Sequence, residues 1–77
     1  MAKIIVYSTK TCPFCVMAED FFTNNNIEFT HYDVSENREK LQEMMSKSGQ
    51  TGVPVIDIDG KIIVGFNEAS IKEILGL

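Results

Sequence analysis

The chain has 77 residues, of which 44% are hydrophobic and 23% charged, a composition ordinary for one soluble globular domain. Seven basic residues stand against eleven acidic ones, and the formal charge of −4 argues against a nucleic-acid or anionic-membrane partner. Because no apolar run approaches the roughly 20 residues of a membrane-spanning helix, and the start lacks the pattern of a secretory signal, we expect a single domain, 1–77, in the cytoplasm.

The first third of the chain predicts a strand followed by a helix, and a second strand comes next. Residues 3–8, KIIVYS, form a nearly continuous β-branched and aromatic run, typical of a strand buried on both faces. A helix is expected from Pro13 to about Asn25. Residues 27–34, IEFTHYDV, fit the second strand. The apolar stripe expected on the helix consists of Cys15, Ala18 and Phe22, with Met17 and Phe21 beside it.

A second helix is predicted after that strand. Ser35 is its expected N-cap, because serine accepts hydrogen bonds from the first free N–H groups of a helix and acidic residues follow it in the first turn. Met44 and Met45 are expected to fill the core. Gly49 is the expected end of the helix, since glycine favours the left-handed conformation found there.

The last third predicts a hairpin and a final helix. Residues 53–64, VPVIDIDGKIIV, contain two apolar runs joined by Asp59 and Gly60, the residues that a two-residue type I′ turn prefers. Asn67 is the expected N-cap of the last helix, and Gly76 is its expected end.

The predicted element order is therefore β-α-β-α-β-β-α, an α/β architecture. The first two strands must be parallel because a helix-length crossover joins them, whereas the hairpin adds an antiparallel pair to the same sheet. The expected fold is a four-stranded mixed sheet flanked by helices, which is the thioredoxin-like arrangement.

The two cysteines of the chain lie in the short motif CPFC, residues 12–15. A structural disulfide between them would close a very short loop, where a crosslink adds little stability, and the compartment is expected to be reducing. A zinc site needs about four ligands, and the chain offers only this pair and the distant His31. No bound metal is therefore expected, and a C-x-x-C motif beside a βαβ pattern indicates a redox pair.

The motif also assigns different roles to the two sulfurs. Proline is favoured at the first helical position, so Pro13 there makes Cys12 the N-cap, whose sulfur would accept hydrogen bonds from N–H groups of the first turn. These groups and the positive end of the helix dipole favour thiolate over thiol. Cys12 is thus the expected nucleophile. Cys15, one turn further on the same face, is the expected resolving thiol.

These residues resemble the glutaredoxins. The match rests on CPFC after IVYS, followed by TGVPVIDIDGKIIVGF, and it covers essentially the whole chain. It implies a thioredoxin-like fold, thiol–disulfide exchange, no permanently bound cofactor, and glutathione as co-substrate. It also implies that Pro54 follows a cis peptide bond and faces the cysteines. The main chain of Val53 would then pair with an extended substrate.

The resemblance also implies a glutathione and substrate site, although the chain departs from the family pattern at several positions. Thr9 stands where a basic residue is usual, and Lys10 can take its place. Gly52 stands where threonine is usual, and Asn67 where aspartate is usual, yet Asn67 still leaves helix N–H groups that can bind a carboxylate. The implied site consists of Lys10, Thr11, Pro13, Phe14, Thr51, Gly52, Val53, Pro54, Gly65, Phe66, Asn67 and Glu68.

Two other functions remain open at this point. The pair Gly65-Phe66 is also similar to redoxins that thioredoxin reductase reduces and that donate electrons to enzymes such as ribonucleotide reductase. Some glutaredoxins instead hold an iron–sulfur cluster between two subunits, a function that the proline of CPFC disfavours. We expect a monomeric disulfide reductase that acts on disulfide-containing proteins, on glutathione mixed disulfides, or on both. Glutathione is the favoured reductant and thioredoxin reductase the alternative.

Overall fold

A computed structural model describes residues 3–77 and confirms the predicted element order. None of the helices in this part of the chain is both long and apolar enough to cross a membrane. The elements are β1 (Ile4–Ser8), α1 (Pro13–Asn24), β2 (Thr30–Asp33), α2 (Arg38–Ser48), β3 (Val55–Ile58), β4 (Lys61–Val64) and α3 (Glu68–Leu75).

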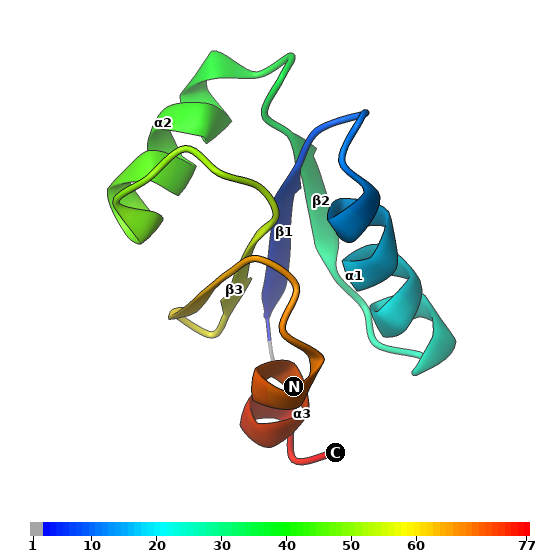
Figure 1. Cartoon of the computed structure of the whole chain (residues 1–77). Helices are drawn as coiled ribbons and strands as arrows, with labels where there is room; N and C mark the ends of the chain where they lie inside the picture. Colours follow the sequence, from blue (N-terminus) through cyan, green and yellow to red (C-terminus); the bar gives the residue numbers. More distant parts are fainter. Residues whose placement is uncertain (1–2) are drawn as a thin grey trace.

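The four strands form one mixed sheet in the order β2-β1-β3-β4 (Figure 1). β1 and β2 are parallel, whereas β1 and β3 pair antiparallel, as do β3 and β4. The hairpin turn is the predicted one: Asp59 and Gly60 have φ angles of 51° and 92°, the positive values that a type I′ turn requires. Both the parallel crossover and the hairpin predicted from the sequence are confirmed.

The sheet separates two apolar cores. On one face, α1 and α3 cover β1 and β3, with Phe22 of α1 and Ile71 of α3 fully buried among strand residues such as Val6. On the other face α2 covers a smaller core, in which Met44 packs against Tyr7. Figure 1 shows α1 and α2 on opposite sides of the sheet.

A charged network also lies under α2. Lys47 Nζ donates to Asp57 Oδ2 at 2.7 Å and to the Tyr7 hydroxyl at 2.8 Å, and the Tyr7 hydroxyl donates to the Glu43 carboxylate. Asp57 is only 7% exposed, and its Oδ1 accepts the N–H of Gly60 at 2.7 Å. The network therefore ties α2 to β1 and β3.

The predicted start of the second helix is wrong by two residues. Ser35 is not the N-cap, because its N–H and hydroxyl both bind Asp33 Oδ1, at 2.9 and 2.5 Å, in the local turn that aspartate favours. Asn37 caps α2 instead, since its Oδ1 accepts the N–H of Lys40 at 3.2 Å. Gly49 ends the helix as predicted, with φ of 72°.

The second strand also begins later than predicted, at Thr30. The N–H of Ile27 donates to the Phe22 carbonyl at 2.8 Å, so Ile27 belongs to the turn that closes α1. Two methionines expected in or beside the core are largely exposed, Met17 by 49% and Met45 by 40%. Periodicity placed them next to apolar positions, but neither methionine belongs to the two buried clusters.

Candidate active site

The sheet register gathers the candidate residues at one end of the molecule. Val55, at the start of β3, pairs with Tyr7 of β1 and with Val64 at the end of β4. Ser8, at the end of β1, pairs with Asp33 at the end of β2. The loops after β1, β2 and β4 and the loop before β3 therefore meet at the same end of the sheet, and they carry nearly all the residues predicted for the site.

The first cysteine lies where the sequence predicts it, at the N-cap of α1. Cys12 has extended backbone angles of −98° and 107°, and Pro13 occupies the first turn. The N–H of Cys15 donates to Cys12 Sγ at 3.2 Å. The sulfur thus takes the place of the oxygen in an ordinary cap, where the helix dipole and a free N–H favour negative charge.

The two sulfurs differ sharply in their surroundings. Cys12 is partly exposed, whereas Cys15 is 0% exposed, and both thiols are free. Burial, with further contributions from the neighbouring Cys12 and Glu19, raises the pKa of the Cys15 thiol to about 12 against the opposing effect of the Thr9 N–H. Cys12 is therefore the sulfur that an incoming disulfide can reach, while Cys15 stays protonated behind it.

The loop before β3 carries the expected proline. The Val53-Pro54 peptide bond is cis, as the resemblance implied, and Pro54 is buried. The Pro54 carbonyl accepts the N–H of Gly65 at 2.8 Å, which joins this loop to the end of β4. Gly65 needs glycine because its φ is +82°, where a Cβ would introduce strain.

Gln50 is a positioning residue that the sequence gave no reason to select. Its Nε2 donates to the Gly52 carbonyl at 3.0 Å, and its Oε1 accepts the Gly52 N–H at 2.5 Å. The side chain therefore holds the turn that leads to Val53. Val53 itself is half-buried, and its main chain makes no hydrogen bond within residues 3–77.

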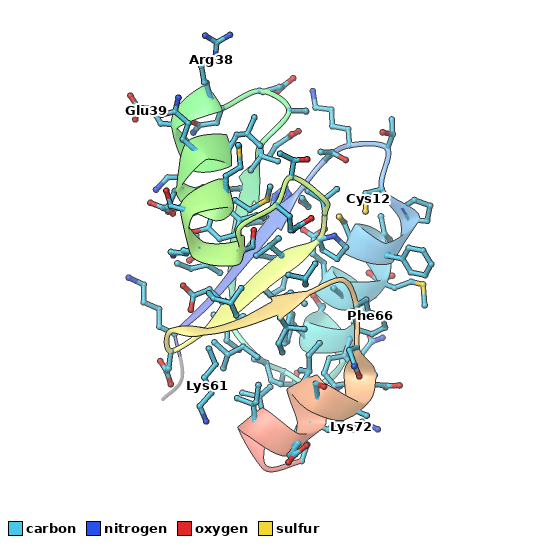
Figure 2. All side chains as sticks on the ribbon, turned by 60° about the vertical axis from the view of Figure 1, so that its left-hand side comes forward. Cys12, Arg38, Glu39, Lys61, Phe66 and Lys72 are labelled. Carbon is cyan, nitrogen blue, oxygen red and sulfur yellow. The ribbon has the colours of Figure 1, made fainter. Side chains whose placement is uncertain are left out.

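Lys10 lies two residues before Cys12 in the loop after β1, and it is already paired. Its Nζ contacts Glu36 in the loop after β2, and this hydrogen bond raises the pKa of the ammonium. Figure 2 shows that the labelled cations Arg38, Lys61 and Lys72 lie away from Cys12. A negatively charged substrate would therefore compete with Glu36 for Lys10.

The loop after β4 leads directly into the N-terminus of α3. Asn67 caps this helix as predicted, and its Oδ1 accepts the N–H of Ser70 at 3.1 Å. Glu68 follows in the first turn and is exposed. The helix thus presents N–H groups to an anion, but it also presents a carboxylate beside them.

Comparison with known proteins agrees with this geometry. The family model for glutaredoxin matches residues 4–63. The chain belongs to the glutaredoxin family. Its thioredoxin-like fold is that of a solved glutaredoxin from Archaeoglobus fulgidus, which is 28% identical with a TM-score of 0.86 and an alignment covering 97% of this chain and 87% of that one.

Curated glutaredoxin relatives cover most of the chain. An uncharacterized glutaredoxin-like 8.6 kDa protein in the rubredoxin operon of Clostridium pasteurianum is 46% identical over 94% of this chain and 96% of its own length. Glutaredoxin 3 of Escherichia coli K12 is 34% identical over 88% of this chain and 82% of its own length. The protein is thus a glutaredoxin-like thiol redox protein.

In this glutaredoxin-family structure the predicted site residues differ in exposure. Phe14 is 59% exposed and free to contact a substrate, whereas Phe66 packs against Phe21, with ring centroids 6.1 Å apart. Figure 2 shows Phe66 on the same side of the molecule as Cys12. Of the residues assigned to the site, Cys15 and Pro54 are buried; Cys12, Val53, Gly65 and Phe66 are partly buried; Lys10, Thr11, Pro13, Phe14, Thr51, Gly52, Asn67 and Glu68 are exposed.

Proposed function

We propose that this protein is a dithiol disulfide reductase of the glutaredoxin type, with Cys12 as nucleophile, Cys15 as resolving thiol and glutathione as co-substrate. The observation that supports this proposal is the difference in exposure and position between the two cysteines. Cys12 is partly exposed and its Sγ accepts the N–H of Cys15 at the N-cap of α1, while Cys15 is fully buried one turn further on. The reaction needs no resident metal or organic cofactor.

The proposed reaction has two thiol–disulfide exchange steps. Cys12 thiolate attacks one sulfur of the substrate disulfide, forms a mixed disulfide and expels the other sulfur as a thiolate, which takes a proton from solvent. Cys15 then loses its proton and attacks Cys12 Sγ. That step breaks the bond to the substrate sulfur and leaves a Cys12–Cys15 disulfide. Two glutathione molecules return the pair to the dithiol form and are themselves oxidised.

The proposed substrates are disulfide-containing proteins in the cytoplasm, on which the protein acts as a monomer. The main chain of Val53, which makes no hydrogen bond within residues 3–77, could pair with an extended segment that carries the disulfide. Phe14 would contribute an exposed apolar surface beside Cys12. Apolar area removed from water there would favour a protein substrate over a small polar disulfide.

A second reductant is supported by the charges around the site. Lys10 is paired with Glu36, and Glu68 adds a carboxylate beside the N–H groups of α3. Both features weaken binding of anionic glutathione. Electrons from thioredoxin reductase would need no such anion site, so this enzyme is the alternative reductant.

A coupled turnover assay on a small disulfide tests the proposal. One arm supplies glutathione with glutathione reductase, and the other supplies thioredoxin reductase. We expect turnover in the glutathione arm. Turnover in the thioredoxin reductase arm alone would show that thioredoxin reductase, and not glutathione, is the reductant. The proposed roles of Cys12 and Cys15 would still stand.

Replacing Glu36 by glutamine is expected to raise glutathione-linked kcat/KM by about twofold to fivefold, the range typical of an exposed ion pair. The change frees Lys10 to meet a glutathione carboxylate, and the gain should shrink at high salt, because salt screens exposed charges. The measurement is the glutathione arm of the coupled assay at low and high salt.

Glu39→Gln is the matched control, because it removes the same charge from the exposed first turn of α2 and lies away from Cys12 (Figure 2). Equal gains in Glu39→Gln and Glu36→Gln would mean that net charge, and not the release of Lys10, is responsible. No gain in either variant would show that Lys10 has no part in glutathione binding.

A further inference from the structure

Three polar side chains from three elements, β1, β2 and α1, meet one another. His31 Nε2 lies 2.5 Å from Ser8 Oγ and 3.6 Å from Glu19 Oε1. His31 pairs with Val6 across the sheet, so its side chain shares a face with those of Val6 and Ser8, the face that α1 covers. We call Ser8, His31 and Glu19 the histidine cluster.

The histidine cluster is partly buried. Ser8 is 1% exposed, whereas the side chains of His31 and Glu19 are 46% and 26% exposed. Both partners contact the same ring nitrogen. A serine nucleophile for acyl transfer would need the carboxylate on the other nitrogen of the imidazole, so the geometry does not support hydrolysis through Ser8. It does offer two partly exposed ionisable side chains, His31 and Glu19, beside the buried Ser8.

Glu19 of the histidine cluster lies on the same helix as the resolving thiol. Glu19 is four residues after Cys15 on α1, a spacing that makes two helical side chains neighbours, and its carboxylate acts electrostatically on Cys15. The N–H of Thr9, the residue after Ser8, also interacts with the Cys15 sulfur. Cys15 itself is 0% exposed, so its proton has no direct way into water.

We propose that Glu19 accepts the proton of Cys15 in the resolving step and that His31, fixed by Ser8, carries this proton to solvent. Glu19 is then a catalytic residue, while His31 and Ser8 are positioning residues that act through it. Because Cys15 attacks only in the dithiol route, this role depends on the proposed function.

The step balances without an added reagent. The Cys15 S–H bond breaks, the proton moves to the Glu19 carboxylate and then to His31 Nε2, and the electron pair stays on Cys15 Sγ. That pair forms the bond to Cys12 Sγ, the bond between Cys12 and the substrate sulfur breaks, and the substrate leaves as a thiolate. Ser8 Oγ can accept a hydrogen bond from protonated Nε2, and His31 then releases the proton to water.

Two further ionisable groups, Cys12 and Asp33, act on Cys15 and His31 respectively. Cys12 faces Cys15 from the same helix, and it is neutral once bound in the mixed disulfide. Asp33, on the same strand as His31, interacts with it electrostatically, but its carboxylate is already held by Ser35. The fixed charge of Glu19 opposes a Cys15 thiolate, whereas proton acceptance by Glu19 promotes its formation. Removal of the carboxylate therefore distinguishes the two effects by sign.

The test is stopped-flow mixing of the reduced protein with dithiobis(nitrobenzoate), an aromatic disulfide that releases a coloured thiolate. The first phase reports attack by Cys12, and the second reports attack by Cys15 on the mixed disulfide. We expect Glu19→Gln to slow the second phase by at least about tenfold and to change the first by less than about twofold, as for loss of a proton acceptor in one step. The second phase should also accelerate as pH rises in this variant, because Cys15 must then lose its proton to solvent base.

Three further variants separate chemistry from structure. Glu19→Asp should restore part of the second phase, and His31→Gln should slow it while leaving the first phase unchanged. Asp20→Asn is the matched control, because it removes an equal charge from the adjacent, exposed position of α1, and it should change neither phase.

Several results would overturn the inference. A second phase that is unchanged or faster in Glu19→Gln would show that the carboxylate is only a fixed opposing charge. Equal slowing of both phases would show a general structural effect. Absence of a second phase in the unsubstituted protein would overturn the dithiol route together with this role, whereas a normal second phase that Glu19→Gln leaves intact overturns this role alone.

Discussion

Replacing Cys12 by serine is expected to reduce disulfide turnover to the background rate. A serine hydroxyl is a far weaker nucleophile toward a disulfide than a thiolate is, so the first exchange step cannot begin. The helix should be unharmed, because serine is among the best N-cap residues and would accept the same Cys15 N–H. The coupled turnover assay measures the loss, and thermal unfolding followed by circular dichroism verifies the fold.

Cys15→Ser is the matched control for this result. It also removes one sulfur from α1, but it leaves the first attack by Cys12 in place. The mixed disulfide should accumulate and be detectable by mass spectrometry. Where the partner in that mixed disulfide is glutathione, a second glutathione can still attack it and free the Cys12 thiol. Turnover that persists in Cys12→Ser would refute the assignment of Cys12 as the nucleophile.

Replacing Asp57 by alanine is expected to lower the free energy of unfolding by about 2–3 kcal/mol, because it leaves partly buried hydrogen-bonding groups without an acceptor. Lys47 Nζ and the Gly60 N–H both donate to this carboxylate at 2.7 Å. Urea unfolding near neutral pH measures the loss. Asp57→Asn is the matched control, since it keeps the shape and an oxygen acceptor while it removes the charge, and it should cost less.

The cost of losing Asp57 should depend on pH. Burial alone would raise the pKa of this carboxyl, but the hydrogen bonds from Lys47 and the Gly60 N–H outweigh burial and hold the pKa below its usual value. A lowered pKa in the folded state adds stability above the unfolded value of about 3.9, and that stability disappears as pH falls through the folded value. The difference between the unsubstituted protein and Asp57→Asn should therefore shrink in acid. A difference that is the same at neutral and acidic pH would refute this assignment.

Most of the fold could be predicted because its signals are local. The cap at Cys12 follows from the proline next to it, and the hairpin follows from Asp59 and Gly60. The start of α2 could not be predicted in the same way, because Ser35 and Asn37 are both good capping residues. What decides between them is the bond from Ser35 to Asp33, and that bond depends on where β2 ends.

The parts of the site that could not be predicted are contacts between distant segments. Lys10 and Glu36 come from different loops, and nothing in either loop marks the other as its partner. Gln50 sits in a polar stretch without a motif, yet it fixes the backbone of Gly52. Such side-chain pairings depend on how the loops meet at the end of the sheet, and a pattern read along the chain does not contain that information.

The division of the core by the sheet has a practical consequence. The sulfurs and the histidine cluster lie on the α1 side, while the network around Lys47 and Asp57 lies under α2. Substitutions at well-separated sites with no shared partners usually have independent effects. Stability toward heat or acid can therefore be changed independently of the rate of thiol–disulfide exchange. Substitutions under α2 can make this protein more stable without altering the reactions of its two cysteines.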